Sequence, residues 1–203
     1  KYIKEAPTNA NQNVLRTSNI ARNNALNQSW ATPQSLIYPL SHILDITHEL
    51  CAHAINSMVH TIGFSEFKSD SVFGLHHDLL KAHTLDLNNI HTYINPPFHQ
   101  NTMKKFLQYT NQLISNQKLK FLLIIAPANH ITKPPHLHQT DLVIYDRNNF
   151  AFLPPQYPMT GLVIRNGGVP FKIAVSIISR QENFLQTIPH QLNSKFYILK
   201  MHD

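Results

Sequence analysis

The residues whose types and spacing best suit a chemical task are Asn95-Pro96-Pro97-Phe98. The side-chain oxygen of Asn95 and the backbone carbonyl of Pro96 are hydrogen-bond acceptors that can hold the two N–H groups of an amine. The two prolines stiffen the loop, so these acceptors need little reordering during a reaction. Phe98 offers a flat ring on which a base can stack. This combination suits methylation of adenine N6, whose lone pair is delocalised into the ring and is a poor nucleophile unless both N–H groups are held.

The elements around this tetrapeptide are predicted to place it at the end of a strand. Ile90–Ile94 is a short β-prone run, and residues 121–126 form a continuous apolar run typical of a parallel strand buried on both faces. Between them, apolar residues at helical spacing predict a helix over about residues 100–116. Ligands of open α/β sheets bind beyond the carboxyl ends of the strands, so this strand–helix–strand context favours a ligand site over a turn whose prolines only begin a helix.

The first half of the chain is predicted to hold a polar extension followed by helix. Residues 1–35 are rich in Asn, Gln, Ser and Thr and are interpreted as an N-terminal extension that wraps the domain or meets a protein partner. Residues 36–203 form the folded domain. Apolar residues from Leu36 to Val59 recur at helical spacing, which predicts one long helix or two broken near Pro39. Residues 62–89 are interpreted as loops with short strands.

The second half is predicted to end in antiparallel strands. Its segments are a Pro/His-rich loop at 127–140, a strand at 142–145, a hairpin formed by 162–165 and 171–178, and a last edge strand at 195–200. A parallel first part followed by a terminal antiparallel hairpin indicates an α/β three-layer sandwich of the methyltransferase kind.

At this point the sequence resembles a known family. Asn-Pro-Pro followed by an aromatic residue resembles the signature of amino-methyltransferases that act on adenine or cytosine. The form with Phe98 is most similar to the phosphorylated-CTD-interacting-factor family, the cap-specific adenosine N6-methyltransferases. The segment Asp70-Ser71-Val72-Phe73-Gly74 matches the Asp-x-x-Phe-Gly that the family has upstream, and Met103 and Phe121–Pro127 match its following helix and strand. The resemblance covers about residues 60–185.

The resemblance implies a Rossmann-like class I methyltransferase fold, with S-adenosyl-L-methionine as the methyl donor. The acceptor would be an adenosine in RNA, or less readily in DNA. Asn95, Pro96, Pro97 and Phe98 would bind the target base. Asp70, Phe73 and Gly74 would lie near the donor pocket, together with Asn95.

Two other functions stay open from the sequence. The chain has five glycines and no Gly-x-Gly cluster of the kind that usually binds the donor. It could therefore be an inactive methyltransferase-like subunit with a structural or nucleic-acid-binding role. Methylation of a protein glutamine amide uses a related Asn-Pro-Pro-Tyr loop, but Phe98 replaces that tyrosine here.

Composition and charge favour a nucleic-acid partner weakly. The formal net charge is +6 and the isoelectric point is about 9.5, but only 14% of the residues are charged. Five lysines are candidates for phosphate contacts, although a solvated face explains them equally well: Lys104, Lys105, Lys118, Lys120 and Lys133. No apolar run approaches the roughly 18 residues of a membrane span.

The cysteine and histidines give further expectations. A single cysteine, Cys51, excludes an internal disulfide and favours an intracellular, reducing compartment. The sequence does not say whether this is the nucleus, the cytoplasm or an organelle reached by a removed targeting peptide. The fourteen histidines form no coherent ligand set with Cys or carboxylates, so no metal site is predicted.

Overall fold

The chain is an α/β protein built on one seven-stranded mixed sheet. The computed structural model describes residues 31–52, 57, 62–65, 68–77, 79, 90–98, 100–150, 152 and 169–182. The strands are β1 (His48–Glu49), β2 (Ile62–Ser65), β3 (His76–His77), β4 (Ile90–Ile94), β5 (Leu119–Pro127), β6 (His138–Tyr145) and β7 (Ile173–Ser179). The helical elements are α2 (Gln34–Ile43), α3 (Gln100–Ser115) and the short 3-10 helices η1 (Lys68–Phe73) and η3 (Ala128–His130).

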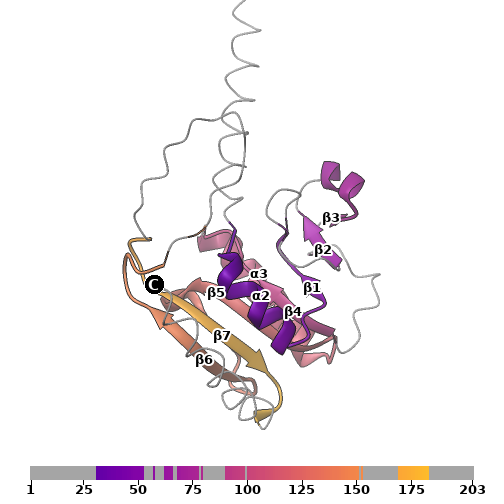
Figure 1. The fold of residues 1–203 in the computed structure, drawn as a ribbon. Coiled ribbons are helices and arrows are strands. Elements are labelled where there is room, and N and C mark those ends of the chain that lie inside the picture. Colours follow the sequence, from indigo (N-terminus) through magenta and orange to yellow (C-terminus); the bar gives the residue numbers. More distant parts are fainter. Residues whose placement is uncertain are drawn as a thin grey trace, which may run out of the picture.

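The sheet has the strand order β3-β2-β1-β4-β5-β7-β6. The first five strands in this order are parallel, while β7 lies antiparallel between β5 and β6. Figure 1 shows the β6 and β7 arrows pointing in opposite directions. It follows that β6 runs in the same direction as β5. The carboxyl ends of the parallel strands therefore meet at one edge of the sheet, and β7 begins at that edge.

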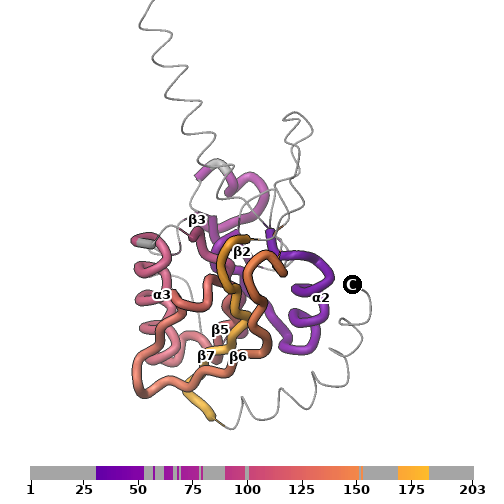
Figure 2. Tube along the Cα trace, turned by 90° about the vertical axis from the view of Figure 1, so that its left-hand side faces the viewer, coloured from indigo at the N-terminus to yellow at the C-terminus, as the bar shows by residue number. Residues whose placement is uncertain are grey.

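Helices cover both faces of the sheet, which gives three layers. Figure 2 shows α3 on one side of the strands and α2 on the other. Each helix faces its own cluster of buried apolar side chains. Leu36, Ile37 and Leu40 of α2 pack with Leu123 and Ile125 of β5. Met103, Leu107 and Ile114 of α3 pack with Leu122 and Ile124 on the opposite face. Alternate residues of β5 thus supply both halves of the core.

The predicted strand–helix–strand unit is confirmed. Strand β4 has the predicted bounds, α3 begins at the predicted residue, and β4 pairs in parallel with β5. Strand β5 extends from Leu119 to Pro127, beyond the predicted apolar run of 121–126, and almost all of it is buried. An apolar run on a strand is stable only if both faces are covered, and here α2 and α3 cover them.

The prediction of a long helix from residue 35 to 59 is wrong, since α2 ends at Ile43. Pro39 lies inside α2 without ending it. The end is set by Asp45, whose φ of 50° is left-handed, and by a hydrogen bond from the Ile46 N–H to the Ser41 carbonyl. This pattern is a Schellman motif, which usually has glycine at the left-handed position. Downstream, His48–Glu49 forms strand β1 instead of helix.

The predicted loop at 127–140 and the terminal hairpin also need correction. Strand β6 begins at His138, inside the predicted loop. Strand β7 matches the predicted second arm of the hairpin, but β5 and β6 occupy both of its edges over its whole length. The antiparallel neighbours of β7 are therefore β5 and β6, in place of the predicted strand 162–165. That strand, residues 1–30 and the predicted strand 195–200 lie outside the described residues.

Candidate functional site

The carboxyl edge of the sheet brings together side chains from five strands. Glu49 ends β1, Ser65 ends β2, and Asn95 directly follows β4. Tyr145 ends β6, and Phe171 lies two residues before the start of β7. Because β1 lies between β2 and β4, Glu49 is central among the three polar residues.

The tetrapeptide lies at this edge, as the sequence predicted. Pro96 is buried, and Asn95, Pro97 and Phe98 are half-buried. The Oδ1 atom of Asn95 is buried, and the residue has other interactions within the chain. The side-chain amide oxygen of Asn95 is a hydrogen-bond acceptor, which is the property that binding an exocyclic amine requires.

The ring of Phe98 is held by two other aromatic rings. Its centroid is 5.1 Å from that of Phe152 and 5.8 Å from that of Phe171. The interplanar angles are 63° and 85°, so both contacts are edge-to-face. Phe98 packs against the apolar clusters of both sheet faces. The predicted stacking ring is thus fixed in the structure, with part of its surface covered by protein.

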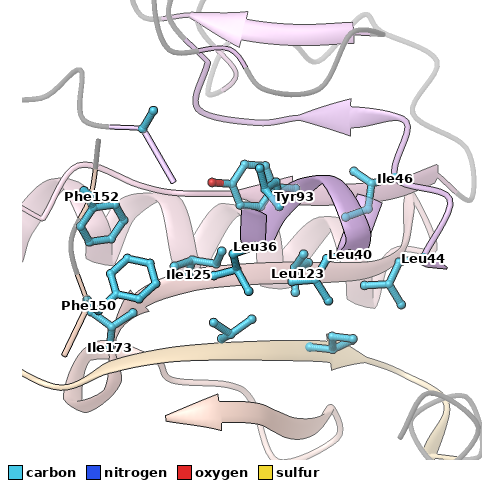
Figure 3. Close-up of a cluster of buried hydrophobic side chains, with 14 of the residues drawn as sticks. Leu36, Leu40, Leu44, Ile46, Tyr93, Leu123, Ile125, Phe150, Phe152 and Ile173 are labelled. Atoms are coloured by element: carbon cyan, nitrogen blue, oxygen red, sulfur yellow. The ribbon is translucent and has the colours of Figure 1, made fainter. Parts of the chain in front are cut away.

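A buried polar group formed by Thr32, Glu49 and Tyr93 was not predicted as part of the site. Glu49 is only 2% exposed, and its Oε2 accepts a 3.2 Å hydrogen bond from the Ser57 hydroxyl. It pairs in register with Tyr93, which lies two residues before Asn95 on β4. The Tyr93 and Thr32 hydroxyls share a short hydrogen bond. Figure 3 shows Tyr93 beside α2, among the buried leucines and isoleucines.

The surroundings of Tyr93 keep its hydroxyl protonated. Complete burial raises the pKa of Tyr93 well above its ordinary value, and the nearby Glu49 carboxylate raises it further. The sequence hid this group because β1 has only two residues and lies within a helix-like apolar pattern. The available signal was Glu49 itself, which is, with Asp45, one of two acidic residues inside that apolar stretch.

The three residues that the family resemblance assigns to the donor pocket differ in their surroundings. Asp70 is buried, and its Oδ2 accepts a 2.7 Å hydrogen bond from the Ser65 hydroxyl at the end of β2. Phe73 is 70% exposed, and Gly74 is exposed with a left-handed φ of 84°. Strands β2 and β4 are two positions apart, so their ends lie about 10 Å apart across the sheet. The hydrogen-bonded pair of Ser65 and Asp70 thus lies on one side of the end of β1, and the tetrapeptide lies on the other.

The candidate phosphate-binding lysines do not form one surface. Lys104 and Lys105 are exposed in the first turns of α3, close to the tetrapeptide. Lys118 and Lys120 lie at the opposite edge of the sheet, where β5 begins. Lys133 follows η3, after the carboxyl end of β5, so Lys118 and Lys120 are the candidates placed away from a nucleic acid bound at the carboxyl edge.

Histidines in the described part of the chain make separate hydrogen bonds and do not gather into a metal-binding group. No group of three or more His, Cys, Asp or Glu in this part of the chain could hold a metal ion. His48 is buried and hydrogen-bonds the Thr47 hydroxyl, and the His136 ring bonds the hydroxyl of Ser115. Burial lowers the pKa of His48 below its usual 6.5, and the nearby His76 lowers it further.

No protein-family model matches the sequence, and no curated protein matches it significantly. In the described part of the chain, no helix has the length and apolar character needed to cross a membrane.

Proposed function

We propose that this protein transfers a methyl group from S-adenosyl-L-methionine to N6 of an adenine in RNA or DNA. The observation that carries the proposal is the position of Asn95-Pro96-Pro97-Phe98 at the carboxyl end of β4. In open α/β sheets this edge is where ligands bind.

The strand order supports a class I methyltransferase fold. The order β3-β2-β1-β4-β5 is that of a doubly wound nucleotide-binding sheet. Class I methyltransferases share this order and insert an antiparallel seventh strand between the fifth and sixth. Strand β7 occupies that position in the present sheet.

The acidic residues at the edge fit a nucleoside-containing donor. In sheets of this kind, a carboxylate near the end of the second strand hydrogen-bonds the ribose hydroxyls of the ligand. Asp70, held by Ser65 at the end of β2, is in that place. Glu49, buried at the end of β1, lies between Asp70 and the tetrapeptide.

In the proposed reaction, the tetrapeptide orients the target amine. Asn95 Oδ1 and the Pro96 carbonyl accept hydrogen bonds from the two N6–H groups, which concentrates the nitrogen lone pair. A bound donor would supply an electrophilic methyl carbon; the nitrogen lone pair would form the new C–N bond while the electrons of the S–CH₃ bond remained on sulfur. The extra proton on nitrogen passes to solvent. The protein contributes alignment and electrostatic stabilisation rather than a covalent intermediate.

The test is transfer of a labelled methyl group to short RNA and DNA strands that contain one adenosine. We expect incorporation into these strands and none when purine riboside, which lacks the exocyclic nitrogen, replaces the adenosine. Asn95→Ala should lower the signal by about 10²- to 10³-fold. Asn116→Ala, at the exposed far end of α3, is the matched control and should retain it. A folded wild-type protein that labels neither RNA nor DNA refutes the proposal.

A second candidate function is favoured by the segment after β1. It reads Leu50-Cys51-Ala52, where donor-binding methyltransferases usually have a glycine-rich loop. An inactive subunit that keeps the fold for nucleic-acid or protein binding would show this change. Calorimetric titration with S-adenosyl-L-methionine separates the two candidates, because micromolar binding supports the enzyme and its absence supports the inactive subunit.

A further inference from the structure

The ring of Phe98 belongs to a continuous series of aromatic contacts. In order, its members are Tyr145, Phe150, Phe152, Phe98 and Phe171, with neighbouring centroids 4.7–5.8 Å apart. Figure 3 shows Phe150 and Phe152 beside one another at one end of the buried cluster. The series joins the segment after β6 to the tetrapeptide after β4.

The segment that carries these rings is anchored by its backbone. The Asn148 N–H donates to the Val169 carbonyl at 2.8 Å, and the Val169 N–H donates to the Phe150 carbonyl at 2.9 Å. Phe150 and Phe152 are 4% and 5% exposed. The buried ring of Phe152 can therefore hold the orientation of the less buried Phe98 ring.

We propose that Phe152 is a positioning residue, whose ring fixes the plane of Phe98 and thereby the plane in which the target base is bound. The inference rests on the proposed function, since it assigns Phe98 the role of base platform. Asn95 fixes the edge of the base through its amine, and the Phe98 plane fixes the tilt of the base. Both are needed to align the nitrogen with the methyl carbon.

The size of the effect follows from the contact that is lost. Phe152→Leu keeps an apolar side chain but removes the edge-to-face contact with Phe98. An aromatic pair of this kind is equivalent to about a 2- to 10-fold change in an equilibrium constant. We therefore expect the KM for an adenosine-containing RNA strand to rise by about that factor, while the Kd for S-adenosyl-L-methionine stays at the wild-type value.

Phe150→Leu is the matched control. Phe150 has the same residue type and nearly the same burial, and its ring contacts Phe152, but no ring contact joins it to Phe98. The two variants should lose similar thermal stability, while the KM for RNA rises for Phe152→Leu alone. Phe171→Leu, at the half-buried second contact of Phe98, repeats the test with less risk to folding.

Three outcomes decide the inference. A rise in the KM for RNA with Phe152→Leu or Phe171→Leu, absent from Phe150→Leu, supports it. Equal changes for Phe152→Leu and Phe150→Leu, in step with their loss of stability, overturn it and leave the proposed function intact. A folded wild-type protein without methyl transfer overturns the proposed function, and this inference with it.

Discussion

The buried hydroxyl pair of Thr32 and Tyr93 allows a quantitative test of how the site is held. Thr32 is fully buried and Tyr93 is 1% exposed, so water cannot replace the hydrogen bond between them. Removing one hydroxyl leaves the other buried without this partner, which costs about 1–3 kcal/mol. Tyr93→Phe and Thr32→Val should each lower the free energy of unfolding by about this amount.

The double variant gives the decisive comparison. When both hydroxyls are replaced by apolar groups of similar shape, no buried hydroxyl of the pair remains, and the net change is close to neutral. We therefore expect Thr32→Val with Tyr93→Phe to be less destabilised than the sum of the single variants, with a coupling energy of about 2–6 kcal/mol, the sum of the two single losses. The assay is urea unfolding followed by circular dichroism. Strictly additive single effects would refute the reasoning.

Three further predictions concern the scaffold and its pH dependence. Gly63→Ala should lower the free energy of unfolding by about 1–3 kcal/mol in urea melts, because the new methyl group would lie 2.5 Å from Leu75 Cδ2 and 3.0 Å from Ala52 Cβ. An unchanged urea midpoint of unfolding would contradict this close packing. Leu123→Ala, at a fully buried position of β5, should lower it by about 2–5 kcal/mol, and a much smaller loss in the same assay would show that the site can collapse. Because the pKa of His48 is lowered in the folded protein, the unfolded chain binds a proton more readily than the folded one. The free energy of unfolding should therefore fall as the pH drops below about 6.5, where free histidine titrates, and through the lower pKa of the folded state. His48→Gln should weaken this pH dependence in urea melts, and an unchanged dependence would exclude His48 as its source.

The middle of the chain could be predicted from the sequence because its local signals agree with its environment. The β-prone run of β4, the amphipathic pattern of α3 and the apolar run of β5 each specify one structure. Their order then places Asn95 at a carboxyl strand end without further information. The position of the tetrapeptide was accordingly predicted correctly.

Strand β1 could not be predicted in this way. It has two residues, and it exists because β2 and β4 pair with it on both sides. Leu44, Ile46 and Leu50 continue the apolar spacing of α2 but reach the core from a non-helical backbone. The helix stops because Asp45, just after it, has a left-handed conformation. A glycine at this position would have indicated a helix end in the sequence, whereas an aspartate does not. Missing β1 also meant missing Glu49.

The aromatic surroundings of Phe98 were hidden for a different reason. Phe152 and Phe171 flank β6 and β7, and they reach Phe98 only because β7 inserts between β5 and β6. That insertion is a long-range pairing, whereas the sequence indicated a local hairpin. Contacts set by strand order are therefore the part of the site that required the structure.

The most direct test of the proposed methyl transfer is to identify the methylated nucleoside. Adenosine-containing RNA is incubated with the protein and S-adenosyl-L-methionine bearing a trideuterated methyl group, digested to nucleosides and analysed by mass spectrometry. We expect N6-(trideuteromethyl)adenosine from the wild type and about 10²- to 10³-fold less from Asn95→Ala, the usual cost of losing one group aimed at developing charge. Label on another atom of the base, or equal yields from both proteins, would contradict the account.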